Sequence, residues 1–275
     1  MEQNEHRSRS IAVVNQKGGV GKTTTAVSLA SALAVADQPT LLVDLDPQAN
    51  ATAGLSPEGT RGEGGTIYEV LAEDRPASKS LRETAVPGLT LLPGNPDLVG
   101  VEVDLATMTS RESRLRAALA PIRSRFRYLV IDCPPSLGLL TLNGLVAAEG
   151  VLIPLQCEYF ALEGLAQLVR TLETVRTRVN PALEIEGIVF TLFDGRTSLT
   201  AQVRAEVERY FKGQVFTTVI PRNVRLSEAP SHGRSILQYD VRSPGAVAYL
   251  ELAKEVLGRD EARTRTGSGR PPTAS

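Results

Sequence analysis

The feature that most constrains this chain is the segment KGGVGKTT at residues 17–24. It directly follows a short apolar run, and it opens a stretch with helical spacing that continues to Val35. Glycines let a backbone approach a phosphate closely, and the N-terminus of the following helix adds partial positive charge. A glycine-rich turn with a coincidental Lys-Thr pair would lack this strand-to-helix context. The sequence therefore predicts a phosphate-binding loop, in which Lys22 contacts the β- and γ-phosphates and the Thr23 hydroxyl ligates Mg²⁺.

The same loop departs from the common G-x-x-x-x-G-K-[ST] pattern at its start. Gln16 stands where that pattern has its first glycine, and Lys17 adds a second lysine. Only five of the 30 basic residues in the chain are lysines. A compact ammonium is a good point-charge partner for a phosphate. Two lysines in one short loop therefore indicate a specific need for that group there.

Three aspartates follow apolar runs that read as strands. Asp44 and Asp46 come at the end of one run, and Asp132 ends another. The carboxyl ends of parallel strands face the ligand crevice of an open α/β sheet. Mg²⁺ keeps several waters and needs few protein ligands. A single aspartate at such a place is commonly a cap or turn residue, but three beside a phosphate loop predict a metal and catalytic site.

Short apolar runs alternate with helical spacing along most of the chain, which predicts an α/β fold: one mostly parallel, twisted sheet with helices on both faces. The expected strands are 10–15, 40–44, 89–93, 128–132, 150–154, 185–193 and 215–220, and the expected helices are 23–35, 111–120, 138–148, 162–179, 199–211 and 245–257. We expect loops at residues 54–65 and 220–233, because glycine, proline and polar residues gather there.

The domain organisation predicted from these patterns is simple. Residues 1–9 form a flexible leader, residues 10–257 a single domain, and residues 258–275 a disordered tail, because the tail has no apolar face to bury. The formal net charge is −1, which excludes a histone-like polycation. The two cysteines, the absence of a signal-type leader and the short apolar runs favour a soluble protein of the cytoplasm.

The loop resembles the deviant Walker A motif of the ParA/MinD ATPases, and the wider match, from Ile11 to about Leu257, is to chromosomal ParA proteins of the Soj type. The resemblance implies a single P-loop NTPase domain, with ATP and Mg²⁺ as cofactors and a weak intrinsic ATPase activity. In that family the lysine that matches Lys17 reaches the partner's phosphates in a dimer that forms on ATP binding. Asp46 matches the residue that orients the attacking water, Asp44 a carboxylate of the Mg²⁺ site, and Asp132 the Walker B aspartate.

The resemblance also assigns the remaining nucleotide contacts. The phosphate-binding residues that match are Lys17, Gly18, Gly19, Val20, Gly21, Lys22, Thr23 and Thr24, and those expected against the adenine base are Pro221, Arg222 and Asn223.

For the chain as a whole, the resemblance implies an ATPase that partitions chromosomes or plasmids. Its ATP-bound homodimer binds DNA without sequence preference, and a ParB-type partner stimulates hydrolysis and release. Arg196 and Arg225 match the arginines that carry this DNA binding. Such a protein is cytoplasmic, associated with the nucleoid and independent of the membrane.

Three other functions share part of this pattern. A MinD-like membrane-associated ATPase, or another cargo-positioning ATPase, would use the same loop, but MinD-like binding needs an amphipathic C-terminal helix, and residues 258–275 contain no leucine, isoleucine or phenylalanine. An electron-transfer ATPase like the nitrogenase iron protein would bridge a cluster with cysteines, but Cys133 and Cys157 do not match that family's pattern. A binding scaffold would not need the three carboxylates.

Overall fold

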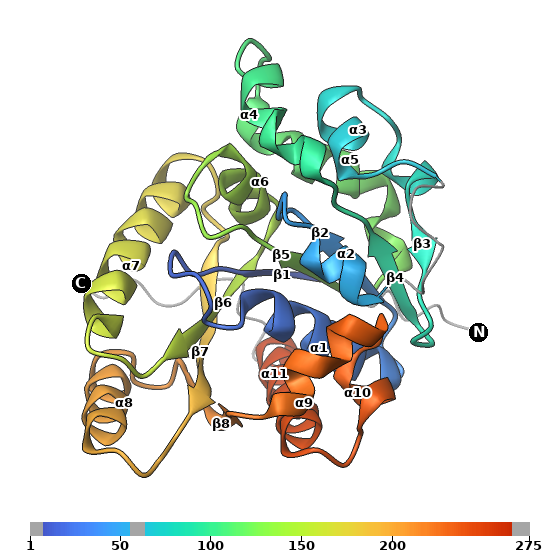
Figure 1. Ribbon diagram of the computed structural model, residues 1–275. Coiled ribbons are helices and arrows are strands. Elements are labelled where there is room, and N and C mark those ends of the chain that lie inside the picture. The colour runs from blue at the N-terminus through green and yellow to red at the C-terminus, as the bar shows by residue number, and fades with distance from the viewer. Residues whose placement is uncertain (1–7, 56–63, 266–275) are drawn as a thin grey trace.

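The computed structural model describes residues 8–55 and 64–265. Within them, eight strands form one sheet in the order β3-β4-β2-β5-β1-β6-β7-β8. All neighbouring strands run parallel except β3, which is antiparallel to β4. The predicted α/β architecture is confirmed (Figure 1).

The strands are β1 (Arg9–Val13), β2 (Thr40–Asp44), β3 (Arg82–Glu83), β4 (Leu89–Leu92), β5 (Tyr128–Asp132), β6 (Gly150–Gln156), β7 (Glu184–Phe193) and β8 (Val215–Pro221). The helices are α1 (Lys22–Val35), α2 (Asn50–Leu55), α3 (Ile67–Ala72), α4 (Val101–Asp104), α5 (Arg114–Leu119), α6 (Leu139–Ala147), α7 (Ala161–Arg178), α8 (Ser198–Tyr210), α9 (Val224–Glu228), α10 (Ile236–Tyr239) and α11 (Pro244–Arg265). Every predicted strand agrees with an observed one to within two residues at each end.

Each central strand is buried on both faces because its side chains alternate between two hydrophobic cores. In β1, Ile11 and Val13 pack into one core and Ala12 into the other. Helices α1 and α11 cover the first face, and α5, α6 and α7 cover the second (Figure 1). This two-sided burial explains why the strands are continuous apolar runs. It also brings the carboxyl ends of β1, β2 and β5 together at one edge.

The C-terminal helix shows that the predicted boundary at residue 257 was wrong. Helix α11 continues to Arg265, so residues 258–265 are helical and not disordered, while residues 266–275 lie outside the described part of the chain. Polar groups hold this last part of the helix. Asp260 pairs with Arg127 and accepts a hydrogen bond of 2.9 Å from the Tyr128 hydroxyl.

Two arginines of the same turn reach the sheet. The Arg259 guanidinium lies 3.9 Å from the centre of the Phe216 ring, and Arg263 donates two hydrogen bonds of 2.9 Å to Glu186. Glu186 is 1% exposed and also accepts a hydrogen bond of 2.7 Å from Arg9. The prediction failed because it looked only for an apolar face, whereas buried ion pairs can dock a polar helix end.

We expect Glu186→Gln to lower the free energy of unfolding by about 3–5 kcal/mol, because it leaves Arg9 as a buried charge without its anionic partner. Urea denaturation would measure the loss. Glu251→Gln is the matched control, since it breaks an exposed pair with Lys254 on α11, and such pairs contribute little. Equal stability of the two variants would contradict the structural role of Glu186.

Three smaller corrections concern the loops and the leader. Residues 224–232 of the predicted loop at 220–233 form α9 and a 3₁₀ turn (Ala229–His232). Gly54 and Leu55, predicted as loop, end α2, and residues 56–63 of that loop lie outside the described part. Arg9, predicted in the leader, begins β1, and residues 1–7 lie outside the described part. In residues 8–55 and 64–265, no helix is both long and apolar enough to cross a membrane.

Candidate active site

The loop between β1 and α1 has the backbone that phosphate binding requires. Gly19 and Gly21 have φ angles of 74° and 83°, in the left-handed region that favours glycine. A Cβ built on Gly18, Gly19 or Gly21 would meet no atom within 4 Å, so open space lies over this part of the loop. Helix α1 begins at Lys22, and its N-terminus faces the same loop. The strand, loop and helix predicted for residues 10–35 are therefore confirmed.

Two side chains outside the motif brace this loop. Asn15 accepts a hydrogen bond of 3.0 Å from the Lys17 N–H and donates one of 2.7 Å to the Pro154 carbonyl on β6. The Thr191 hydroxyl, on β7, donates a buried hydrogen bond of 2.8 Å to the Val20 carbonyl. The loop is thus attached to β6 and β7, the first two strands on one side of β1.

The two lysines of the loop occupy different environments. Lys22 is 7% exposed, and its Nζ donates a hydrogen bond of 2.8 Å to the Lys17 carbonyl. Burial lowers the pKa of Lys22, and the charges of Asp132 and Asp46 oppose this shift. The Lys17 side chain is 47% exposed and forms an ion pair with Glu158, at the turn between β6 and α7. Lys22 therefore points inward and Lys17 lies at the surface.

Asp44 and Asp132 lie side by side at the ends of β2 and β5, where they are paired in the sheet register. Both are fully buried. Asp44 accepts hydrogen bonds of 2.8 and 2.7 Å from the N–H and hydroxyl of Thr52. Burial raises the pKa of Asp44 to about 6. Burial and the neighbouring Asp44 raise the pKa of Asp132 well above its ordinary value, although Thr23 and Lys22 act in the opposite direction.

The Asp132 carboxylate fits a divalent cation. Neither of its buried oxygens has a hydrogen-bond partner of good geometry in the described structure, even though Thr23 lies near enough to affect its pKa. A buried acceptor without a donor is costly, and a cation would satisfy it. No group of three or more His, Cys, Asp or Glu side chains in residues 8–55 and 64–265 is arranged to hold a metal by itself. This donor set suits Mg²⁺, which takes its other ligands from water and phosphate.

We expect Asp132→Asn to stabilise the metal-free protein at neutral pH. Because the pKa values of the Asp44–Asp132 pair are raised in the folded state, that state binds more protons than the unfolded chain, and the free energy of unfolding falls as pH rises from 3.8 through about 6. The variant should therefore gain on the order of 1–3 kcal/mol at pH ~7.5 in EDTA. The gain should shrink near pH ~4.5. Urea denaturation at both pH values measures it, and a variant less stable than wild type at the higher pH would contradict the prediction.

Asp46 lies two residues beyond Asp44 and is 7% exposed. Its Oδ1 accepts a hydrogen bond of 2.9 Å from the Gln48 N–H, which fixes the carboxylate at the start of the loop after β2. Its charge acts on Lys22, Asp44 and Asp132. The structure therefore brings all three predicted aspartates to the phosphate loop.

Known proteins share both this sequence and this fold. Residues 8–185 match the AAA domain family. The chromosome partitioning protein ParA of Myxococcus xanthus is 54% identical over 92% of this chain and 89% of its own. The sporulation initiation inhibitor protein Soj of Bacillus subtilis is 52% identical over 90% of this chain and 97% of its own. The chain belongs to the ParA/MinD family.

A solved structure extends the comparison. Cobyrinic acid a,c-diamide synthase from Mycobacterium smegmatis, determined with a bound ATP analog and magnesium, is 39% identical to this ParA/MinD family member. The match covers 97% of this chain and 100% of the other, with a TM-score of 0.79. The predicted family and fold class are therefore confirmed.

A hollow of about 400 Å³ adjoins the first turn of α1 in this ParA/MinD chain. Thr23 and Thr24 line one side, and α2 and residues 226–236 line the others. Pro221, Arg222 and Asn223, which the family resemblance implies lie against the base, are separated from this segment by two residues. Asn223 Oδ1 is buried without a hydrogen-bond partner in the described structure, so it can accept from a ligand. Arg222 is exposed.

The two predicted DNA-binding arginines follow the ends of neighbouring strands. Arg196 lies in the turn after β7, and Arg225 lies in α9 after β8. The side chain of Arg196 is 88% exposed and that of Arg225 is 49% exposed. Each guanidinium is held by carboxylates of this same chain: Asp194 for the first, and Glu228 with Asp240 for the second.

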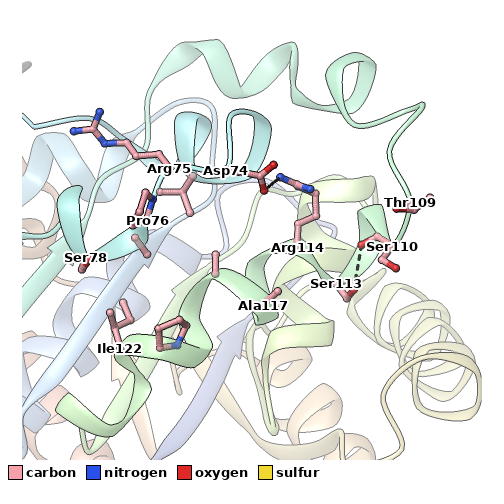
Figure 2. A pocket seen from close by; sticks show the side chains of 14 residues that line it. Asp74, Arg75, Pro76, Ser78, Thr109, Ser110, Ser113, Arg114, Ala117 and Ile122 are labelled. Carbon is pink, nitrogen blue, oxygen red and sulfur yellow. Dashed lines mark hydrogen bonds and ion pairs between the residues drawn. The ribbon is translucent and has the colours of Figure 1, made fainter.

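A separate hollow of about 430 Å³ lies between α3 and α5. Asp74 and Arg114, which line it, form an ion pair of 2.5 Å. Small and apolar side chains such as Ala117 and Ile122 line much of the rest (Figure 2). No residue predicted for catalysis lines this hollow. It is therefore distinct from the phosphate-loop site.

Sequence reasoning missed three residues that hold the site in place: Asn15, Thr52 and Thr191. Thr52 fixes Asp44 and also accepts a hydrogen bond of 2.9 Å from the Gly94 N–H. Asn15 directly precedes the loop, so its position gave a signal. The positions of Thr52 and Thr191 gave no such signal, because each acts through a contact with a residue elsewhere in the sequence.

Proposed function

We propose that this chain is an ATPase that partitions DNA. It hydrolyses ATP to ADP and phosphate with Mg²⁺ and binds DNA without sequence preference as an ATP-bound dimer. The observation that carries the proposal is the loop with one buried and one surface lysine beside paired, buried aspartates. The name of the relative that is 54% identical, a chromosome partitioning protein, supports the partitioning role.

In the proposed reaction, the backbone of residues 18–24 holds the phosphates, and Lys22 neutralises charge on the transferred group. Thr23, Asp44 and Asp132 would hold Mg²⁺, which would supply positive charge to neutralise the phosphates. Asp46 orients the attacking water. Phosphoryl transfer has a loose transition state, so water placement and charge neutralisation count for more than proton removal.

The dimer gives Lys17 its role. An exposed lysine at the start of the loop can reach the phosphates of a second subunit, as the family resemblance implies, once it leaves Glu158. Closing two subunits around ATP doubles the number of arginines that one DNA duplex meets. Because phosphate contacts act together through counterion release, dimerisation raises DNA affinity steeply.

The proposed partner and location follow from the same cycle. A ParB-type protein would stimulate hydrolysis, separate the subunits and release the DNA. We propose that the protein acts in the cytoplasm, on the nucleoid.

We expect Arg196→Ala and Arg225→Ala each to weaken ATP-dependent DNA binding by about 3–10-fold and to reduce the salt dependence by about one phosphate per protomer. A salt titration of DNA binding by fluorescence anisotropy, with ATP and Mg²⁺, tests the proposed function directly. Arg116→Ala on α5 is the matched control, because Arg116 is also an exposed arginine. An unchanged titration for both arginine variants, or no DNA binding by wild type, would refute the DNA-partitioning role.

The names of the relatives suggest two different functions, and the sequence identities favour partitioning. The relative named for chromosome partitioning is 54% identical, against 39% for the structure named as a diamide synthase. The MinD-like alternative has less support, because the end of α11 is tied to the sheet through Asp260 and Arg263. Binding to liposomes of anionic lipid with ATP would revive it.

A further inference from the structure

The turn after β7 holds Arg196 in an unusual way. Asp194 Oδ1 accepts hydrogen bonds from the Arg196 backbone N–H at 3.1 Å and from its Nε at 2.8 Å, and Oδ2 accepts one from Nη2 at 2.6 Å. The carboxylate thus accepts two parallel hydrogen bonds from one edge of the guanidinium. Phosphate binds arginine through the same kind of paired contact.

The backbone before this turn is strained. Leu192 has a φ angle of 49°, in the left-handed region, which is costly for a bulky side chain. The preceding residue, Thr191, is fixed by its buried hydrogen bond to the Val20 carbonyl. The strained residue lies within β7, at an irregularity in the pairing with β8 and two residues before Asp194.

Two neighbouring arginines are also paired with carboxylates, each through a single hydrogen bond. Arg204 pairs with Glu208, and Arg209 pairs with Glu206, both on α8. Asp194 differs from these helix-surface carboxylates in two respects. It is less exposed, at 28% against 45% and 42%. It also binds both the side chain and the backbone of its arginine.

We propose that Asp194 occupies the place of a DNA phosphate on Arg196 and thereby sets the DNA affinity of this surface. DNA must displace the carboxylate, or bind a guanidinium whose charge is already neutralised. The proposal rests on the proposed function, since it concerns the same DNA-binding surface. Its consequence is that the wild-type surface binds DNA less tightly than its arginines alone would allow, which favours release after each cycle.

The electrostatics agree with this role. The hydrogen bonds from Arg196 hold the pKa of Asp194 well below its ordinary value, and Arg222 lies near enough to lower it further. Asp194 is therefore an anion at every pH at which DNA would bind. The competition is a constant property of the surface and not a pH switch.

The test is Asp194→Asn, with DNA binding measured by anisotropy in ATP and Mg²⁺ across a salt series. The amide oxygen can still accept from the Arg196 backbone, but the competing charge is gone. We expect binding about 3–10-fold tighter. Glu208→Gln changes the net charge equally on the adjacent helix, and we expect less than about a twofold effect from it.

A double variant decides whether the effect runs through Arg196. In the Arg196→Ala background, Asp194→Asn should leave DNA affinity unchanged. A gain no larger than that of Glu208→Gln, or a gain that persists in the Arg196→Ala background, would overturn the inference while the proposed function stands. Failure of wild type to bind DNA with ATP would instead overturn the proposed function. Thermal unfolding equal to wild type establishes that the variants are folded.

Discussion

Replacing Lys17 by alanine is expected to lower ATP turnover by about 10²–10³-fold, comparable to the loss of one transition-state donor, and to abolish ATP-dependent dimerisation. The structure gives the reason. Lys22 is buried beneath the loop, whereas the Lys17 side chain lies at the surface, where its ammonium pairs with Glu158. An exposed ion pair costs little to open, so Lys17 is free to serve a second subunit. Phosphate release and light scattering, each with ATP and Mg²⁺, measure the two effects.

Two variants control for the loss of charge. Lys79→Ala removes another exposed lysine, outside the loop, and should change neither measurement. Lys17→Arg keeps the charge but replaces the compact ammonium, and we expect only partial recovery. If Lys17→Ala dimerised normally with ATP, the shared site would be wrong, although each subunit would still bind a nucleotide.

Replacing Asp46 by alanine is expected to reduce ATP turnover by about 10²–10³-fold while leaving ATP binding and dimerisation intact. Asp46 contacts the Gln48 N–H and acts on the other site groups through its charge, but it does not brace the loop. Its removal therefore deprives the water of its orienting group without dismantling the phosphate site. DNA retention should persist, because hydrolysis no longer ends the ATP-bound state.

Comparison with Asp46→Asn separates positioning from proton removal. An amide oxygen can still accept a hydrogen bond from water, so a positioning role predicts intermediate turnover for Asp46→Asn. Normal turnover in Asp46→Ala would refute the assigned role. Loss of ATP binding in the same variant would show instead that Asp46 belongs to the nucleotide-binding groups.

The parts of this fold that the sequence predicts well are those governed by burial. The central strands are continuous apolar runs because helices cover both faces of the sheet, and the phosphate loop is constrained by its glycines at positive φ. The positions of Asp44 and Asp132 follow directly, since both end strands that pair in register.

What the sequence did not reveal depends on contacts between distant residues. The last turns of α11 lack an apolar face, and they are ordered by Asp260 and Arg263, whose partners are over 70 residues away. Thr191 acts through a single hydroxyl, which has no signature in a sequence. The ion pair at Arg196 is local, but only the structure shows that the carboxylate takes the edge that a phosphate would use.

The hydrogen bond from Thr191 to Val20 has a mechanical consequence. Val20 lies in the middle of the phosphate loop. Its carbonyl accepts the hydrogen bond from Thr191, two residues before the end of β7. Any displacement of that carbonyl when the γ-phosphate arrives or leaves must stretch this buried bond or pull the strand with it. Asp194 is only three residues further along the backbone. The phosphate loop is therefore linked to the Arg196 turn by one buried hydrogen bond and a short stretch of backbone.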